Sequence, residues 1–159
     1  MITHIFLDVD NTILDFNKAE AIALEKTLSA LSVPHSPEVI RRYSQLNLAQ
    51  WKLLEQGKLT REQVKVRRYR LLFDDASPEE AARIYEGLLG QGHYFMDGAV
   101  EMLQALYGSF HLYLATNGTA SVQKSRLKSA EIEPFFEQIF ISEELGCNKP
   151  ETSFFERCF

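Results

Sequence analysis

The chain has 159 residues, enough for one domain with a small insertion, and its 45% of hydrophobic and 25% of charged residues are ordinary for a soluble globular protein. A formal net charge of -5 excludes general binding to a nucleic-acid polymer, which needs a basic face, but leaves room for a local positive site that binds an anionic substrate. Two cysteines without a CxxC pair provide no disulfide framework and indicate a reducing cytoplasm.

The first predicted element is a buried parallel strand, because residues 4–9, HIFLDV, form a short apolar run of good strand formers. Asp8 and Asp10 stand two positions apart and so face the same way along an extended chain. They also interrupt the apolar N-terminus, which has no basic region, so we predict no signal peptide. No stretch approaches the roughly 18 apolar residues of a transmembrane helix, and we expect no membrane partner.

Four helical segments with no convincing strand between them come next. Ser36 with Pro37 is a helix start, and Thr60 with Gln63 forms a capping box. We interpret Arg67 to Arg70 as a solvated helix face and Tyr43 as part of the core of this region. The predicted helices cover residues 17–32, 36–57, 60–73 and 77–92.

Helices and strands alternate in the rest of the chain, which is typical of a parallel sheet with right-handed crossovers. The predicted helices are 98–108, 121–132 and the start of one in 151–159, and the predicted strands are 110–118 and 137–142. The fold class is therefore α/β. We predict a Rossmann-like core made of residues 1–15 and 93–159, interrupted by a helical insertion at residues 16–92.

Each predicted strand ends in polar residues: Asp8 to Thr12, Ala115 to Gly118, and Cys147 to Pro150. Ligands of open parallel sheets bind beyond the carboxyl ends of the strands, so these clusters should converge on one site. Taken singly, each residue has an ordinary structural interpretation. The two aspartates could simply form a turn, Thr116 could be a hydroxyl at a strand end, and Lys149 could be a solvated lysine. Their common register at the strand ends favours catalysis.

Together these residues have the chemistry of phosphoryl transfer. Asp8 can attack an electrophile, while Asp10 can protonate a leaving oxygen and then activate water. Mg²⁺ near both aspartates would relieve their repulsion, and Lys149 would neutralise phosphate. The Thr116 hydroxyl and backbone N–H groups would bind phosphate oxygens. The predicted phosphate-binding residues are Val9, Asn11, Thr116, Asn117, Gly118 and Lys149.

The motifs DVDNT, ATNG and NKP after three strands resemble those of the haloacid dehalogenase superfamily, and the helical insertion looks like its C1-type cap. The resemblance implies that Asp8 is the nucleophile and a Mg²⁺ ligand. It implies that Asp10 is the acid/base and binds Mg²⁺ through its carbonyl, with Thr116 and Lys149 as the phosphate-binding pair. The stretch FISEELGCNKPETSFFERCF is most similar to the pyrimidine 5′-nucleotidase branch, which implies a nucleoside monophosphate as substrate.

The second aspartate, Asp10, favours hydrolysis of phosphate esters over cleavage of carbon–halogen bonds. A leaving alkoxide needs a proton, whereas a halide does not. Two alternatives remain open at this stage. One is a sugar-phosphate phosphatase or phosphomutase with the same core motifs, and the other is a catalytically inactive binding module. The sequence predicts no oligomeric state.

One departure from the family pattern is that no acidic pair follows Lys149, although the family has such a motif after a further strand. We therefore expect the natural protein to continue past Phe159 and the chain by itself to bind Mg²⁺ poorly. We also expect the first strand to lie at an open edge of the sheet. The last residues, Phe154, Phe155, Cys158 and Phe159, should have little to pack against.

Overall fold

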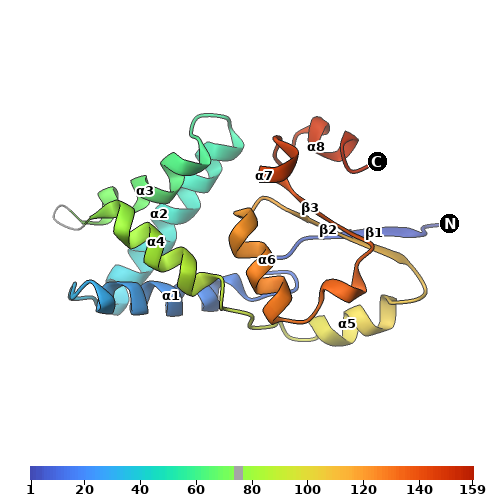
Figure 1. The fold of residues 1–159 in the computed structure, drawn as a ribbon, viewed down its shortest axis with the longest axis horizontal. Helices are drawn as coiled ribbons and strands as arrows, with labels where there is room; N and C mark the ends of the chain where they lie inside the picture. Colours follow the sequence, from blue (N-terminus) through green and yellow to red (C-terminus); the bar gives the residue numbers. More distant parts are fainter. Residues whose placement is uncertain (74–76) are drawn as a thin grey trace. The chain divides into compact units, whose positions relative to one another are not determined.

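A computed structural model describes residues 1–73 and 77–159, which divide into two compact units. The core unit consists of Met1–Phe16 and Gly90–Phe159, and the helical unit consists of Asn17–Leu89 (Figure 1). The sequence placed these boundaries after residues 15 and 92. That the helical unit acts as a cap stays a prediction.

The core unit contains a parallel sheet, as predicted, with the strand order β1-β2-β3 (Figure 1). Its strands are β1 His4–Leu7, β2 His111–Thr116 and β3 Gln138–Ile141. In register, Leu7 lies beside Leu114, and Thr116 lies beside Ile141. β1 is an edge strand of the described sheet, as expected. The prediction that β1 is a buried strand is wrong, because residues 5–7 are only half-buried and His4 is exposed.

Helices cover both faces of this sheet (Figure 1). They are α5 Ala99–Leu106, α6 Ala120–Ser129, α7 Ser142–Leu145 and α8 Thr152–Glu156, with a 3₁₀ turn at Glu133–Phe135. Two of these elements differ from the prediction. The 3₁₀ turn was not expected, and Ser142 begins α7 instead of ending β3.

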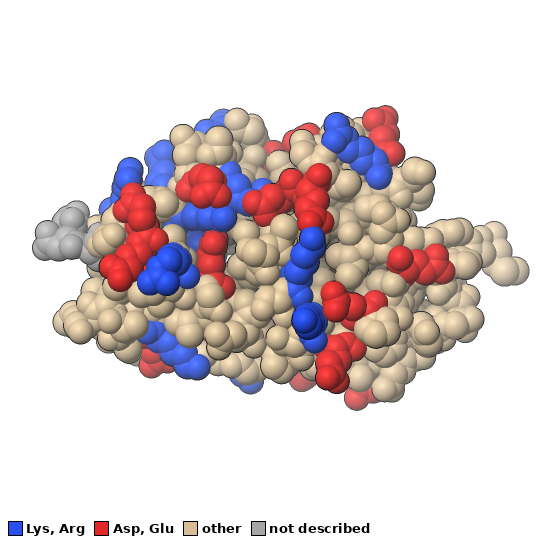
Figure 2. Space-filling view, viewed as in Figure 1, with Lys and Arg blue, Asp and Glu red and all other residues tan. Residues whose placement is uncertain are grey.

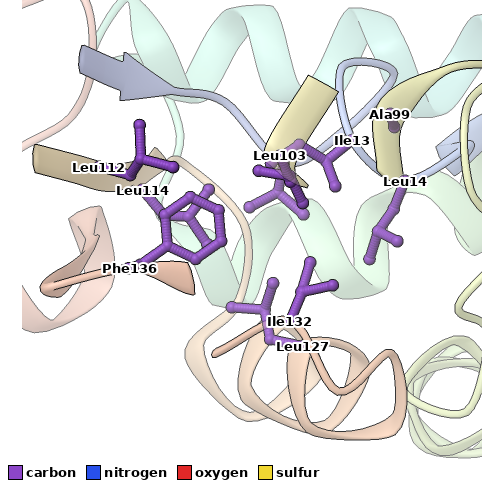
Figure 3. Packing of buried hydrophobic residues seen from close by; sticks show 10 residues of the cluster. Ile13, Leu14, Ala99, Leu103, Leu112, Leu114, Leu127, Ile132 and Phe136 are labelled. Atoms are coloured by element: carbon purple, nitrogen blue, oxygen red, sulfur yellow. The ribbon is translucent and has the colours of Figure 1, made fainter. Parts of the chain in front are cut away.

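The larger apolar cluster lies on the side of the sheet that carries α5 and α6 (Figure 3). Leu112 and Leu114 of β2 point into it, where they pack with Leu103 of α5 and Leu127 of α6. Alternate residues of a strand face opposite ways, so Ala115 points to the other face of the sheet. The loop after β1 also contributes to this cluster through Ile13, which is fully buried.

A side chain of α8, Phe154, covers part of the opposite face of the sheet. Phe154 is 0% exposed and packs with Phe140 and Cys147, so the expectation that it would have little to pack against is wrong. Burial of such a side chain contributes roughly 1.5–3 kcal/mol. Cys158 is also partly buried against this cluster. Phe159 stays 91% exposed, and its ring contacts the ring of Phe6 at 5.4 Å between centres.

Two helices of the helical unit begin where the capping signals predicted, after Ser36 and after Thr60. The helices of this unit are α1 Phe16–Ala30, α2 Pro37–Glu55, α3 Arg61–Leu72 and α4 Pro78–Leu89. Ser36 accepts a hydrogen bond from the Val39 N–H at the start of α2. Both bonds of the capping box between Thr60 and Gln63 are formed at the start of α3.

The interpretation of Arg67 to Arg70 as a solvated face is wrong for Arg68, which is only 3% exposed. Val64, Arg68 and Leu72 are four residues apart and lie on the buried stripe of α3. Tyr43 is fully buried in this unit, as predicted.

The surface charge and the hydropathy of the helices are as the composition predicts. Acidic and basic side chains are interspersed on the face of the molecule shown in Figure 2. Within residues 1–73 and 77–159, none of the helices combines the length and the apolar character needed to cross a membrane.

Candidate active site

The loop after β1 and the last part of β2 both contact the side chain of Lys149, which lies in the loop region after β3. Its Nζ lies 3.0 Å from Oδ2 of Asp8, which follows β1. The same Nζ donates a hydrogen bond of 2.7 Å to the carbonyl oxygen of Ala115, near the end of β2. The convergence that the parallel topology predicts is therefore present in the structure for these three segments.

Asp8 is held at both of its carboxylate oxygens and is still open to solvent. Oδ1 accepts a hydrogen bond of 2.8 Å from the Val9 N–H, and Oδ2 faces Lys149. The Asp8 side chain is 44% exposed. An oriented, accessible carboxylate beside a cation is suited to attack on an anionic substrate, because the cation attracts the substrate and fixes the attacking group.

A reciprocal pair of hydrogen bonds fixes the main chain of Lys149. The Asn117 Nδ2 donates to the Lys149 carbonyl at 2.9 Å, and the Lys149 N–H donates to Asn117 Oδ1 at 2.8 Å. The Asn117 side chain thus joins the loop after β2 to the loop that carries Lys149. The sequence predicted that Asn117 shapes its own turn and binds phosphate, and it gave no signal for this contact with Lys149.

Thr116 is buried at the end of β2, where its hydroxyl oxygen accepts two hydrogen bonds. One comes from the Gly118 N–H at 3.1 Å and the other from Gln123 Nε2 at 2.8 Å. Gly118 is needed there, because a Cβ at this position would lie 2.5 Å from Gln123 Nε2. The Gly118 N–H, which we expected to bind phosphate, is engaged with Thr116 in this structure.

The turn after Asp10 is closed by local hydrogen bonds. Asn11 has a left-handed φ of 56°, its N–H donates to the Leu14 carbonyl at 2.7 Å, and its Oδ1 accepts from the Phe16 N–H at 3.0 Å. The N–H groups of Val9 and Asn11, both predicted to bind phosphate, therefore have partners within the loop. Either would have to leave its partner to bind a phosphate oxygen.

Asp10 contacts two side chains of α6. Its Oδ1 is paired with Arg126 Nη1, and its Oδ2 accepts a hydrogen bond of 2.9 Å from Gln123 Nε2. Burial raises the pKa of Asp10 and the Asp8 charge adds to this, while Arg126 and the Gln123 hydrogen bond act in the opposite direction. A raised pKa favours a carboxyl group that holds a proton.

Gln123 and Arg126 are the residues that the motif analysis missed. They are 1% and 0% exposed, although they are polar. A signal for them exists in the sequence. The segment 121–132 was expected to pack as a crossover helix, yet it has few apolar residues for its buried face, and Gln123 and Arg126 are three apart, as neighbours on a helix face are.

The donor atoms at the strand ends are those that Mg²⁺ prefers. Asp8 supplies an accessible carboxylate oxygen. The Asp10 donor that the resemblance implies is its main-chain carbonyl oxygen, because its carboxylate is paired with Arg126 and Gln123. Over residues 1–73 and 77–159, no group of three or more His, Cys, Asp or Glu side chains is gathered in a way that could hold a metal. Mg²⁺ keeps several water ligands and often binds only one or two carboxylates together with substrate phosphate, so these residues fit it.

Residues 2–159 match the family described as haloacid dehalogenase-like hydrolase. The chain is 35% identical to the HAD-hydrolase YfnB of Bacillus subtilis strain 168, in an alignment that covers 98% of this chain and 68% of YfnB. It is 34% identical to the pyrimidine 5′-nucleotidase PynA of Streptococcus pneumoniae, with 96% of this chain and 67% of PynA covered.

A similar solved structure is the crystal structure of YfnB from Bacillus subtilis, described as bound to magnesium and as revealing interdomain movement. The TM-score is 0.95 at 34% sequence identity, and the superposition covers 99% of this chain and 73% of that one.

Proposed function

The chain belongs to the haloacid dehalogenase-like hydrolases, and on that premise we propose that it hydrolyses phosphate monoesters through a phosphorylated Asp8. The observation that carries this proposal is the Lys149 ammonium, 3.0 Å from the exposed carboxylate of Asp8. A cation in contact with a nucleophilic carboxylate offsets the repulsion that this carboxylate would otherwise exert on an approaching phosphate dianion.

In the first step, an Asp8 oxygen attacks phosphorus and the bond from phosphorus to the leaving oxygen breaks. Asp10 donates its proton to that oxygen, so that an alcohol leaves instead of an alkoxide. In the second step, Asp10 removes a proton from water, and the resulting hydroxide attacks the phosphorus. The bond between Asp8 and phosphorus breaks, inorganic phosphate leaves, and Asp8 is restored as a carboxylate.

The phosphate group needs donors on its other oxygens during both steps. Lys149 and the Thr116 hydroxyl are assigned to them, with the N–H groups of the two loops as further donors. Asp8 and Asp10 would hold Mg²⁺, which supplies neutralisation of the charge between carboxylate and phosphate. The helical unit is assigned the role of a cap that excludes water from the phosphorylated carboxylate.

For the substrate we propose a nucleoside monophosphate. The support is that PynA and a second relative, YjjG of Escherichia coli, at 25% identity, are named pyrimidine 5′-nucleotidases. The core motifs serve the phosphate alone, and so they do not distinguish a nucleotide from a sugar phosphate.

The test is release of phosphate by the full-length gene product and by its Asp8→Asn variant, with and without Mg²⁺. We expect Asp8→Asn to lower kcat by about 1,000-fold or more, because the amide is a poor nucleophile. Glu137→Gln is a matched control, since this carboxylate precedes β3, at the opposite ends of the strands, and contacts His111 and Tyr113. Unchanged phosphate release by Asp8→Asn would overturn the mechanism.

A panel of nucleoside and sugar monophosphates tests the substrate separately. We expect kcat/KM to be highest for a nucleoside monophosphate. A higher value for a sugar phosphate, or an isomerised product instead of free phosphate, would overturn the nucleotide assignment and leave the phosphorylated Asp8 intact.

A further inference from the structure

We infer that Arg126 and Gln123 of α6 are positioning residues that hold the Asp10 carboxylate in its orientation, and that Arg126 links this orientation to the segments where the chain leaves and re-enters the core unit. This inference rests on the proposed function, because it needs Asp10 to exchange protons with substrate and water.

The first support is that each carboxylate oxygen of Asp10 has its own partner. Arg126 Nη1 pairs with Oδ1, and Gln123 Nε2 donates to Oδ2 at 2.9 Å. The two partners are also bonded to each other, since Arg126 Nη1 donates to Gln123 Oε1 at 3.0 Å. Rotation of the carboxylate would break one bond at each oxygen, so its plane is fixed by α6.

The second support is that Gln123 joins the proposed acid/base to the proposed phosphate-binding threonine. Its Nε2 donates to Asp10 Oδ2 and also to Thr116 Oγ1, at 2.8 Å. One buried amide nitrogen thus sets the spacing between these two groups. A proton donor must stay within hydrogen-bond reach of the leaving oxygen, so this spacing matters for the reaction.

The third support is the environment of Arg126. It is 0% exposed, and its Nη2 is buried with no hydrogen-bond partner within the described parts of the chain. A fully buried guanidinium with an unsatisfied donor is a costly way to fill a core, and an apolar side chain of similar volume often does so at least as well. Arg126 makes three polar contacts that such a side chain could not make, with Asp10, Gln123 and the Gly92 carbonyl, and the partner in the first of these is a carboxylate.

Arg126 also contacts both ends of the interrupted core. Its Nε donates to the carbonyl of Gly92 at 3.0 Å, and its guanidinium lies 5.8 Å from the centre of the Phe16 ring. Phe16 is the last core residue before the helical unit, and Gly92 follows soon after the chain returns at Gly90. A shift of either segment therefore acts on the group that holds Asp10.

The experiment compares two phosphate monoesters in the full-length gene product. A nucleoside monophosphate loses an alkoxide that needs a proton, whereas 2,4-dinitrophenyl phosphate loses a stable phenolate that does not. In Arg126→Met, we expect single-turnover cleavage of the nucleotide to fall on the order of 100-fold, with the burst of dinitrophenolate within about threefold of wild type. A merely structural role would lower both rates alike, and that result would overturn the inference.

If Arg126→Met fails to fold, Gln123→Leu tests the same inference, because it removes the three hydrogen bonds of the Gln123 amide at nearly constant side-chain volume. We expect the same selective loss. Lys128→Met is the matched control, since Lys128 is an exposed cation of the same helix, and it should change neither rate. Phe16→Leu should lower nucleotide cleavage several-fold and leave the burst unchanged. If Phe16→Leu cleaves the nucleotide at the wild-type rate, the inferred link between Arg126 and the segment at Phe16 is wrong.

The outcome separates this inference from the proposed function. If Asp8→Asn abolishes turnover of both esters while Arg126→Met and Gln123→Leu lower them equally, the proposed function stands and the positioning role is wrong. If the wild type cleaves neither ester in Mg²⁺, both are wrong.

Discussion

Among the residues that the structure describes, each unit buries one arginine, and the two arginines have different partners. Arg126 of the core unit is paired directly with the carboxylate of Asp10. Arg68 of the helical unit has no carboxylate in direct contact among the described residues. Its Nη1 donates to Asn47 Oδ1 at 2.9 Å, and its Nε donates to the Lys65 carbonyl at 3.2 Å.

Aromatic rings take the place of a counter-ion around Arg68. Its guanidinium lies 4.7 Å from the ring centre of Tyr85, 5.4 Å from that of Tyr69 and 5.8 Å from that of Tyr43. Burial raises the pKa of all three tyrosines, so they surround the cation as neutral rings. Arg68 is linked to the Glu20 carboxylate through the amide of Asn47, because Asn47 Nδ2 donates to Glu20 Oε1 at 2.6 Å.

The contrast indicates what each arginine is for. The partners of Arg68 all belong to the packing of α1, α2, α3 and α4, so it specifies how these helices fit together. Arg126 instead contacts a group of the proposed reaction. We therefore expect substitutions of Arg68 to affect stability and substitutions around Arg126 to affect turnover.

The largest effect on stability is expected for Arg68→Met. The substitution leaves buried Asn47 Oδ1 without its donor and removes the cation near Glu20, which should cost about 3–5 kcal/mol of the free energy of unfolding. Urea denaturation measures it, with exposed Arg67→Met as the control. Below the melting temperature, kcat of Arg68→Met should equal that of wild type. A loss of kcat without a loss of stability would reverse the comparison.

The next prediction compares alanine substitutions of two glycines, one from each unit. A Cβ at Gly118 would overlap the Gln123 side chain, whereas one at Gly87 of α4 would meet nothing within 4 Å. We expect Gly118→Ala to lower kcat about tenfold by displacing Gln123, and Gly87→Ala to stabilise the protein by roughly 0.5–1 kcal/mol. In a Gln123→Leu background, Gly118→Ala should have little further effect on kcat. Additive effects would show that Gly118 does not act through Gln123.

A smaller effect is the pH dependence that Glu20 gives to the helical unit. Burial raises its pKa above the usual 4.5, while hydrogen bonds from Ser44 and Asn47 and the charge of Arg68 oppose this. The folded state therefore binds the proton more tightly than the unfolded state does. The contribution of Glu20 to stability is present below the unfolded pKa and is lost as the pH rises through the folded pKa.

Urea denaturation of the wild type and of Glu20→Gln at pH 4.5 and pH 7.5 measures this contribution. Between these values, we expect the wild type to lose free energy of unfolding relative to Glu20→Gln. The opposite sign would mean that Arg68 acts on Glu20 as strongly as a directly paired cation, and the contrast with Arg126 would disappear.

The smallest effect is expected for an arginine on the surface of the helical unit. Arg70 Nη2 lies 2.9 Å from Glu79 Oε1, and both side chains are more than 60% exposed. Exposed ion pairs contribute about 0–1 kcal/mol, so Arg70→Ala should shift the urea midpoint only slightly. A shift as large as that of Arg68→Met would mean that burial is not what distinguishes the two arginines.

Capping residues and hydrophobic periodicity in the sequence determined most of the helices and strands. The order of those elements determined that the motifs converge. Ser36 and Thr60 mark helix starts through bonds to residues three positions away, and those bonds are present. Alternation of helices and strands implies a parallel sheet, and a parallel sheet brings its strand ends together. Asp8, Thr116 and Lys149 could therefore be assigned to one edge before any coordinates were known, although their roles in catalysis stay predictions.

Only the tertiary structure decided which polar side chains are buried and which residues they contact. Arg68 was expected to be solvated and Phe154 to have little to pack against, but both side chains are buried. Gln123 and Arg126 reach Asp10 across 113 and 116 positions of the chain. Such contacts depend on how a helix is rotated against the sheet, and that rotation follows from the packing of apolar residues such as Leu127 and not from the polar residues themselves. A sequence pattern shows that a helix has a buried face, but the partner of an arginine on that face is chosen by the assembled core.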